Sequence, residues 1–317
     1  MIISQIIKYE LKKSYALLPA NRDIIIEQLR GLLDNPMSKI IIRADVQHFF
    51  ETIPQQPLLS KIKDDGFISR LTFKYLTKFF LCCNEATNNT SKVGVPRGLP
   101  FSSYLAELYM RPIDDEISQM EGIYYYMRYV DDMIIIADPD AWSREECWAR
   151  LKEIFQGWKL ELHEDSQKKF LSQVDVDTDN IAFDYLGYTF EYSKGKLSLK
   201  MTQKRFKKYQ TMIDAVFSIY SKCANYRKGK EQSNGERKLR KDALSQLLER
   251  VKMLTSNGLL SGRKNYVATG IYYSNKFLTS TEQLAALDDY LYRTINDKER
   301  FNPPNTLFNY NENNNYY

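Results

Sequence analysis

The sequence predicts an α+β protein in which a mixed body of helices and strands is followed by a basic helical segment. Short β-branched, apolar runs alternate with amphipathic helical patterns up to residue 199, and beyond it the spacing is helical almost throughout. We therefore expect a first domain over 1–199 and a helical second domain over 200–300. A flexible tail rich in Asn, Pro and Tyr is expected over 301–317.

The chain is expected to begin with helices that lead into a buried strand. Apolar residues recur at helical spacing over 1–33, and Pro19 interrupts the pattern. The run 39–45 (KIIIRAD) is short, β-branched and apolar, which is typical of a buried strand. Helices follow over 58–83 and 101–120, separated by a polar loop.

Two hairpins come next. The strand-like runs 123–129 and 133–137 are joined by Val130, Asp131 and Asp132, which predicts a hairpin with acidic residues at its tip. Beyond it the pattern predicts a helix, a second hairpin and a long helical segment with a polar break, at 142–158, 183–201 and 203–295.

Composition excludes several classes of protein. The chain has 317 residues, of which 43% are hydrophobic, enough to bury a sizeable core. No apolar run approaches the roughly 18–20 residues of a membrane span, and the start of the chain lacks signal-peptide architecture. Four cysteines without paired spacing and two histidines favour neither a zinc site nor a disulfide scaffold. We expect a cytoplasmic protein that does not bind membranes.

Positive charge is concentrated in one block. The formal net charge is +5, yet residues 200–252 alone carry 15 Lys and Arg against five Asp and Glu. A basic block on an otherwise mildly acidic chain indicates a face that binds a polyanion such as nucleic acid. The alternative is a pair of solvated helices with ordinary surface lysines.

Three carboxylates lie at the ends of predicted apolar strands. Asp45 closes the strand 39–45, and Asp131 and Asp132 occupy the hairpin tip. Carboxylates in such places are unfavourable unless they pair with cations or bind metal. Hard oxygen ligands of this kind suit Mg²⁺. Taken alone, Val130, Asp131 and Asp132 are more typical of a plain tight turn.

Five segments, in order along the chain, resemble the palm motifs of reverse transcriptases. They are 43–53 (RADVQHFFETI), 93–103 (VGVPRGLPFSS), 126–135 (YMRYVDDMII), 160–168 (LELHEDSQK) and 183–188 (FDYLGY). The style of 96–102 and 105–109 resembles bacterial members related to retrons, group II introns and abortive-infection systems. The segment 270–275 (GIYYSN) resembles the helical tail of defence-associated members.

The resemblance implies a right-hand polymerase with reduced fingers, a palm with an antiparallel sheet, and a helical thumb and extension. It also implies two Mg²⁺ ions, with Mn²⁺ as a substitute. Asp45, Asp131 and the Val46 carbonyl would be ligands of these ions, and Asp132 would support them. The ions would promote attack of a primer 3′-hydroxyl on the α-phosphate of a nucleotide.

The resemblance also implies residues that contact the nucleotide. Phe50 stands where the family places a bulky residue against the sugar, which selects deoxynucleotides; otherwise Phe50 is a core residue like its neighbour. Arg97 and Gly98 belong to a loop that approaches the nascent base pair, although most relatives carry Gln in place of Arg97. Arg22 is a candidate contact to the triphosphate or an ordinary surface residue.

Further contacts are implied for the pyrophosphate, the primer and the template. Lys168 is the candidate donor to the leaving pyrophosphate, with Lys169 nearly as suitable and a plain surface lysine as the alternative. The turn Leu186, Gly187 and Tyr188 would grip the primer. In the thumb, the residues expected to track the nucleic-acid backbone are Lys204, Arg205, Lys207 and Lys208.

The expected function is that of an RNA-directed DNA polymerase in antiphage defence. Its partners would be an RNA template, a DNA primer and product, dNTPs, and in addition a non-coding RNA, a partner protein or a second copy of the chain. The alternatives are a polymerase with little or no template, a catalytically silent nucleic-acid-binding subunit, and an RNA-dependent RNA polymerase, which Phe50 opposes.

Overall fold

The computed structural model describes residues 2–18, 20–175, 177–178, 180–225, 234–255, 259–261, 266–268 and 270–297. It divides into two compact units, which we call unit 1 (Met1–Asp179 with Ser193–Lys196) and unit 2 (Asn180–Tyr192 with Leu197–Tyr317). The predicted domain boundary at residue 200 stays a prediction, and the tail expected over 301–317 lies outside the described residues. Within the described ranges, no helix is both long and apolar enough to cross a bilayer.

Unit 1 alternates helices and strands, as the sequence predicts. Its helices are α1 (Ile2–Ser14), α2 (Arg22–Leu33), α3 (Phe49–Thr52), α4 (Gln55–Asp65), α5 (Arg70–Ala86), α6 (Ser102–Ser118) and α7 (Arg144–Gly157), and its strands are β1 (Lys39–Asp45), β2 (Ile123–Tyr129), β3 (Asp132–Ala137) and β4 (Phe170–Val174). Side-chain caps define several starts: Asn21 caps α2, Ser69 caps α5, and Ser143 and Glu146 form a capping box on α7.

One expected helix is interrupted. The pattern over 58–83 predicted a continuous helix, but α4 ends at Asp65 and α5 begins at Arg70. Gly66, the C-cap of α4, has a φ of 63°. This left-handed conformation is the usual way to end a helix and is accessible to glycine without strain.

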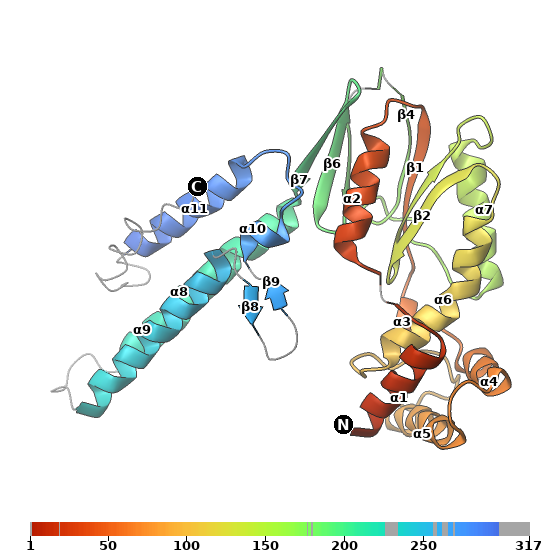
Figure 1. Ribbon diagram of the computed structural model, residues 1–317, viewed down its shortest axis with the longest axis horizontal. Coiled ribbons are helices and arrows are strands. Elements are labelled where there is room, and N and C mark those ends of the chain that lie inside the picture. The colour runs from red at the N-terminus through yellow and green to blue at the C-terminus, as the bar shows by residue number, and fades with distance from the viewer. Residues whose placement is uncertain are drawn as a thin grey trace. The chain divides into compact units, whose positions relative to one another are not determined.

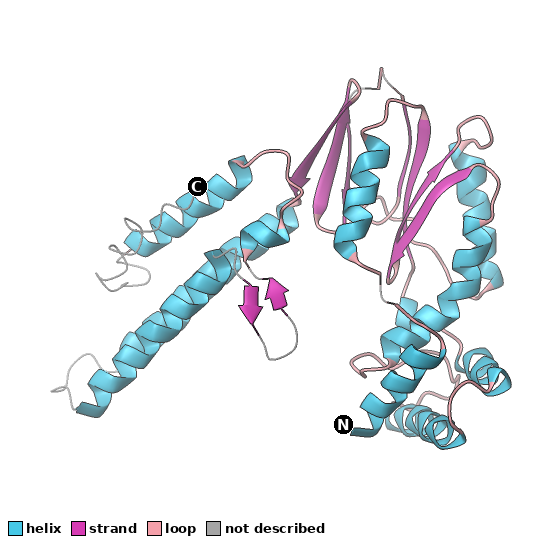
Figure 2. Ribbon diagram, viewed as in Figure 1, coloured by secondary structure: helices cyan, strands magenta, loops and turns pink. Residues whose placement is uncertain are grey.

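The strands of unit 1 form an antiparallel sheet in the order β2-β3-β1-β4 (Figures 1 and 2). Successive residues of β1 face opposite sides of this sheet. Ile40, Ile42 and Ala44 belong to the main core with α6 and α7, whereas Ile41 is buried on the face it shares with Arg43 and Asp45. Burial of both faces explains the continuous apolar run by which the sequence predicts β1.

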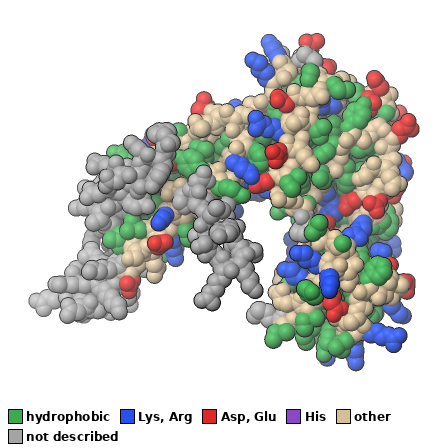
Figure 3. All heavy atoms as spheres, in the orientation of Figure 1, with side chains coloured by type: hydrophobic (Ala, Val, Ile, Leu, Met, Phe, Trp, Pro, Cys, Tyr) green, Lys and Arg blue, Asp and Glu red, His purple; other side chains and the backbone are tan. Residues whose placement is uncertain are grey.

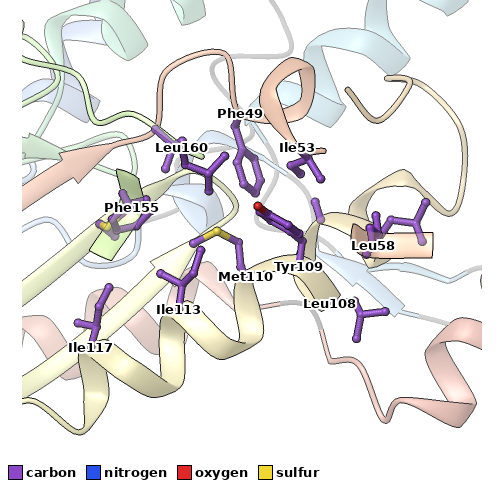
Figure 4. Packing of buried hydrophobic residues seen from close by; sticks show 14 of the residues in the cluster. Phe49, Ile53, Leu58, Leu108, Tyr109, Met110, Ile113, Ile117, Phe155 and Leu160 are labelled. Atoms are coloured by element: carbon purple, nitrogen blue, oxygen red, sulfur yellow. The ribbon is translucent and has the colours of Figure 1, made fainter. Parts of the chain in front are cut away.

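Helix α6 is the centre of the main core. It buries Leu105, Leu108, Tyr109, Met110, Ile113 and Ile117, which pack with Phe49, Ile53, Phe155 and Leu160 (Figure 4). The Tyr109 hydroxyl donates to the Trp158 carbonyl. Each fully buried side chain of this size stabilises the fold by about 1.5–3 kcal/mol. Helix α6 is therefore firmly anchored, and its polar side chains are held on a rigid support.

Some apolar side chains of unit 1 remain on the surface. On α1 and α5 they are Ile2, Ile6, Tyr9, Leu71, Tyr75 and Leu81. Figure 3 shows hydrophobic surface beside Lys and Arg side chains at the end of unit 1 where these helices lie. This surface is available to a partner molecule.

Unit 2 begins with a three-stranded sheet in the order β5-β6-β7 and continues as helices. Its elements are β5 (Ile181–Tyr185), β6 (Tyr188–Ser193), β7 (Lys196–Met201), α8 (Gln203–Asn225), α9 (Asn234–Thr255), β8 (Leu259–Ser261), β9 (Tyr266–Ala268), α10 (Ile271–Ser274) and α11 (Glu282–Asn296). The helices α8, α9 and α11 share a core that includes Phe217, Val251 and Ile295. The prediction of helix nearly to Ile295 was wrong between α9 and α10, where β8 and β9 form an antiparallel pair.

Candidate active site

The three predicted carboxylates meet at one end of the sheet of unit 1. Asp45 ends β1, Asp132 begins β3, and the two are direct partners in the register. The Val46 amide donates to the Asp131 carbonyl at 3.1 Å, which brings Asp131 to the same place. Only 5% of the Asp45 side chain is exposed. Residues far apart in the sequence thus form one acidic edge.

Asp131 belongs to a two-residue hairpin turn. Tyr129 pairs with Asp132, so only Val130 and Asp131 form the loop between β2 and β3. Val130 has a φ of 63°, a left-handed conformation that a β-branched residue rarely adopts. Such a conformation costs about 1–3 kcal/mol and persists only where surrounding contacts impose it. The turn therefore stores strain next to a candidate catalytic residue.

Arg43 engages both oxygens of Asp132. Its Nε lies 3.0 Å from Oδ1 and its Nη2 lies 3.1 Å from Oδ2, while Nη1 donates to the Gln167 carbonyl at 3.2 Å. A two-point pair of this kind fixes both the position and the plane of the carboxylate. Arg43 therefore holds Asp132 in place, and direct binding of an ion by Asp132 would require that pair to open. Its supporting role stays a prediction.

Asp45 is paired with the lysine that the sequence favoured. Lys168 Nζ lies 2.6 Å from Asp45 Oδ2, and His163 Nε2 lies 3.4 Å from Oδ1. Lys169 instead lies 2.7 Å from Glu164 and over the Trp148 ring, 4.3 Å from its centroid. Of the two candidate lysines, the structure brings Lys168 to the acidic edge.

The electrostatics of this edge favour an additional cation. Burial, and next the negative charge of Asp45, raise the pKa of Asp131 above its ordinary value, although Lys168 and Arg97 act in the opposite direction. Burial also raises the pKa of Asp132, which Arg43 partly offsets. In the described part of the chain, no cluster of three or more His, Cys, Asp or Glu side chains forms a complete metal site.

The residues nevertheless fit Mg²⁺. This ion keeps several of its waters and takes only one or two carboxylates together with substrate phosphate. Asp45 and Asp131 supply two hard oxygen donors at one edge, and a lysine ammonium already contacts one of them. The site matches an ion held jointly by protein and substrate, not one enclosed by protein alone.

Phe50 and Arg97 lie together beside this edge. Phe49 is buried, whereas Phe50 is only partly buried and meets it edge-on with ring centroids 5.3 Å apart. The Arg97 guanidinium lies over the Phe50 ring, 5.6 Å from its centroid, and grips both oxygens of Glu51 at 2.6 and 2.7 Å. Phe49 thus belongs to the core, and Phe50 packs against that core while staying partly exposed.

The loop that carries Arg97 is fastened to the segment after β1. The Gly94 amide donates to the Ile53 carbonyl at 2.8 Å, and the Val95 amide donates to the Phe50 carbonyl at 2.6 Å. A Cβ at Gly94 would lie 3.1 Å from the Glu51 carbonyl oxygen, so only glycine allows this approach. Gly98 follows with a φ of 82°.

Arg22 lies at the start of a helix. It opens α2, and its Nη1 is 3.7 Å from Asp23 Oδ1. Its predicted contact with a triphosphate stays a prediction.

In unit 2 the predicted primer grip is a tight turn packed against α8. Leu186 and Gly187 connect β5 to β6 with φ values of 46° and 82°. A Cβ at Gly187 would lie 2.8 Å from Arg205 Nη1. Arg205 donates to the Ser274 carbonyl at 2.8 Å and lies over the Tyr188 ring.

Two of the predicted nucleic-acid contacts are therefore used within unit 2. The Tyr188 side chain is buried, and the partly exposed Arg205 donates to Tyr209 and to the Ser274 carbonyl, so both make contacts within unit 2. Their contacts with nucleic acid stay predictions. The exposed basic residues of α8 are Lys204, Lys207, Lys208 and, near the end of the helix, Lys222. Of the four predicted thumb residues, Lys204, Lys207 and Lys208 form the accessible basic face.

Sequence reasoning missed several residues that shape the site, chiefly Arg43, Glu51 and His163. Arg43 had a usable signal, because it lies two positions before Asp45 on a strand and so shares its face. Glu51 and His163 had none, since their partners Arg97 and Asp45 are distant in the sequence.

Comparison with known proteins gives a family match over most of unit 1. The model of the family described as reverse transcriptase (RNA-dependent DNA polymerase) matches residues 2–190. No curated protein matches the chain.

Solved telomerase structures are similar in part. Telomerase from Candida albicans, solved in complex with a TWJ fragment of telomeric RNA, has 13% identity and a TM-score of 0.44, covering 92% of this chain and 50% of that one. Apo telomerase from Candida tropicalis has 13% identity and a TM-score of 0.47, covering 79% and 50%. The chain spans about half the length of these structures.

Proposed function

Since the chain belongs to the reverse transcriptase (RNA-dependent DNA polymerase) family, we propose that it extends a nucleic-acid 3′-hydroxyl with deoxynucleotides on an RNA template. The observation that carries this proposal is the meeting of Asp45 and Asp131 at one edge of the sheet, with Lys168 in contact with Asp45. A binding protein would not need a buried and a partly buried carboxylate placed together.

In this proposal Asp45, Asp131 and the Val46 carbonyl hold two Mg²⁺ ions, for which Mn²⁺ can substitute. When bound, these ions lower the pKa of the primer hydroxyl and neutralise charge on the pyrophosphate. Asp132 keeps its pair with Arg43 and holds the start of β3 in place. Lys168 leaves Asp45 and donates a proton from Nζ to the leaving pyrophosphate oxygen.

Phe50 is proposed to select the sugar. Its ring is only partly buried, and Arg97 and Phe49 limit its movement from two sides. A ring held in this way leaves no room for a 2′-hydroxyl, so deoxynucleotides are preferred. Arg97 lies close enough to lower the pKa of Asp131, which suits a residue that meets an incoming phosphate once it releases Glu51.

Nucleic acid is proposed to bind the basic face of α8. Lys204, Lys207 and Lys208 lie exposed on adjacent turns of this helix. Contacts from lysines to phosphates give affinity without sequence preference, as a polymerase requires.

The biological setting is proposed from motif style alone. Segments 96–102, 105–109 and 270–275 resemble bacterial defence-associated reverse transcriptases, which supports a role in antiphage defence in the cytoplasm. The exposed apolar residues of α1 and α5 support binding of a further partner, a protein or a non-coding RNA.

The test is synthesis by the purified protein on a defined RNA template with a DNA primer, dNTPs and Mg²⁺, followed by sequencing of the product. The complement of the template is expected from the wild type, and no product from Asp131→Asn. Asp138→Asn is the matched control, because it changes a partly exposed aspartate just beyond β3, at the end of the strand away from Asp132, and should retain synthesis.

The product decides between the alternatives. A homopolymer or simple repeat unrelated to the template would replace the proposal with untemplated synthesis. Absence of any product from the wild type, with bound RNA retained, would replace it with a binding role.

The sugar gate has its own test, which compares incorporation of dNTPs and rNTPs. Phe50→Ala should raise ribonucleotide incorporation by at least about tenfold, since loss of a steric block is worth more than 1.4 kcal/mol. The control is Phe67→Ala, which removes an exposed ring of the same unit. Unchanged discrimination in the Phe50 variant would remove the gate.

A further inference from the structure

Arg128 is a buried arginine three residues before Asp131. It lies near the end of β2, and only 5% of its side chain is exposed. It makes charge-assisted hydrogen bonds to two carboxylates: Nη2 lies 2.8 Å from Glu107 Oε2 and 2.7 Å from Asp114 Oδ2, and Nε lies 2.9 Å from Asp114 Oδ1. A buried guanidinium is tolerated only when its donors are satisfied in this way.

Both carboxylates come from one helix. Glu107 and Asp114 are seven residues apart on α6, which places them two turns apart on the same face. The opposite side of α6 is anchored in the main core. The Tyr126 hydroxyl also donates to Asp114 Oδ1, at 2.6 Å. The ion pairs outweigh the effect of burial and raise the pKa of Arg128 above its ordinary value. The arginine is therefore a fixed cation held by a fixed helix.

The remaining donor of Arg128 reaches the catalytic turn. Nη1 donates to the Val130 carbonyl at 2.7 Å as well as to Glu107 Oε1 at 3.2 Å. Val130 is the residue with the strained φ of 63°, and Asp131 follows it directly. The carbonyl of the strained residue thus accepts a hydrogen bond from a β2 side chain whose ion pairs are with α6.

We propose that Arg128 is a positioning residue that clamps the Val130–Asp131 turn to α6 and so keeps the Asp131 carboxylate beside Asp45. Only a guanidinium can do this, because one planar group must meet two carboxylates and a carbonyl at once. A lysine at this position keeps the charge and meets fewer acceptors. The inference rests on the proposed catalytic role of Asp131 for its kinetic consequence, but the clamp itself is a structural property.

The clamp also links two parts of the site. Helix α6 begins at Ser102, directly after the loop that contains Arg97 and Gly98, and the Ser102 hydroxyl donates to the Pro96 carbonyl. A movement of that loop on nucleotide binding would be passed through α6 and Arg128 to the turn that carries Asp131. In this connection Arg128 belongs to β2, the strand that leads directly into the turn.

The test uses Arg128→Lys, with Arg150→Lys as the matched control. Arg150 also pairs with a carboxylate of α6, Glu116 at 3.2 Å, but both partners are exposed and far along the helix from the turn. Amide hydrogen exchange at Val46 measures the turn directly, because this amide donates to the Asp131 carbonyl. Exchange at Val46 should be at least about tenfold faster in Arg128→Lys and unchanged in Arg150→Lys.

Kinetics provide the second measurement. Misplacement of a catalytic group by about 1 Å lowers turnover by roughly 100-fold. Arg128→Lys is therefore expected to lower kcat by 10- to 100-fold and to leave KM for the nucleotide unchanged. A wild type that does not polymerise would refute the proposed function, whereas the exchange measurement would still decide the clamp.

A second substitution separates positioning from general stability. Glycine adopts a φ of 63° without strain, so Val130→Gly removes the need for the clamp. Arg128→Lys should then have at most about a third of its effect on Val46 exchange in the Val130→Gly background. Equal effects in the two backgrounds, or normal Val46 exchange in a folded Arg128→Lys protein, would overturn the proposal.

If Arg128→Lys does not fold, a second variant tests the same proposal. Arg128→Met combined with Glu107→Gln and Asp114→Asn removes the whole charged group together, so no buried charge is left unpaired. The same fast exchange at Val46 is expected in this variant, and slow exchange would overturn the proposal.

Discussion

Replacing Lys168 by Met should make the protein bind divalent cations more tightly while making it a poorer polymerase. The lysine ammonium lies 2.6 Å from Asp45 Oδ2, where it competes with any ion for the same oxygen. In the proposed reaction the same lysine later donates a proton to pyrophosphate. One substitution therefore acts in opposite directions on binding and on turnover.

The size of the binding effect follows from the exposure of the pair. The Lys168 side chain is 43% exposed and the Asp45 side chain 5%, so the pair is neither fully solvated nor fully buried. Exposed ion pairs are worth about 0.2–1 kcal/mol, and partial burial places this one near 1 kcal/mol after solvent screening. Loss of that competition corresponds to about fivefold tighter binding.

The assay is titration of the protein with Mn²⁺, followed by electron paramagnetic resonance of the free ion, together with primer extension. Lys169→Met is the control, because Lys169 carries the same charge one residue away but pairs with Glu164. Its removal should change Mn²⁺ affinity by less than about twofold. Equal tightening in the two variants would refute direct competition at Asp45, as would an unchanged affinity in Lys168→Met.

Three further outcomes are expected. Gly187→Ala should destabilise unit 2 by about 2 kcal/mol in thermal denaturation, since a left-handed φ and a Cβ 2.8 Å from Arg205 Nη1 both oppose it; a neutral result would mean that Arg205 moves freely. Asp131→Asn should raise stability by about 0.2–1 kcal/mol at neutral pH, because the variant no longer buries a charge and no longer repels Asp45. A raised carboxyl pKa costs stability as pH rises from about 3.9 through the folded value, so this gain should vanish below pH 4; a gain that persists there would contradict an electrostatic origin. Neutralising Lys204, Lys207 and Lys208 should weaken nucleic-acid binding equally for all sequences and make the affinity depend less on salt concentration. An unchanged dependence on salt would exclude contacts from these lysines to phosphate.

The strands around the acidic edge could be predicted from the sequence because their patterns are strong. β1 and β3 are continuous apolar runs rich in Ile; β1 ends in aspartate, β3 begins with one, and both strands are central in the sheet. β4 was not predicted, because its residues include Ser172 and Gln173 and it lies at the edge, where burial on both faces is not required. Patterns of burial reveal strands only where the fold buries them.

The candidate site, too, could be predicted only in part. The positions of Asp45, Asp131 and Phe50 follow from motif spacing, and the structure brings the two carboxylates together. The ion-pair partners could not be predicted, because the sequence offers Arg128 many carboxylates. Only the packing of α6 against β2 determines which two lie within reach. Arg205 shows the converse, since its basic neighbours suggested a surface role, whereas its partly exposed side chain also donates to the Ser274 carbonyl.

The sheet order has a consequence for synthesis of the chain on the ribosome. β1 leaves the ribosome long before its neighbours: Arg43 and its partner Asp132 are 89 positions apart, and β4 comes later still. At about 5–20 residues per second, the strand KIIIRAD waits roughly 5–20 s with both of its edges unpaired. Charges within and beside an apolar strand oppose its pairing with other chains. Lys39, Arg43 and Asp45 therefore protect the nascent protein from aggregation before two of them enter the active site.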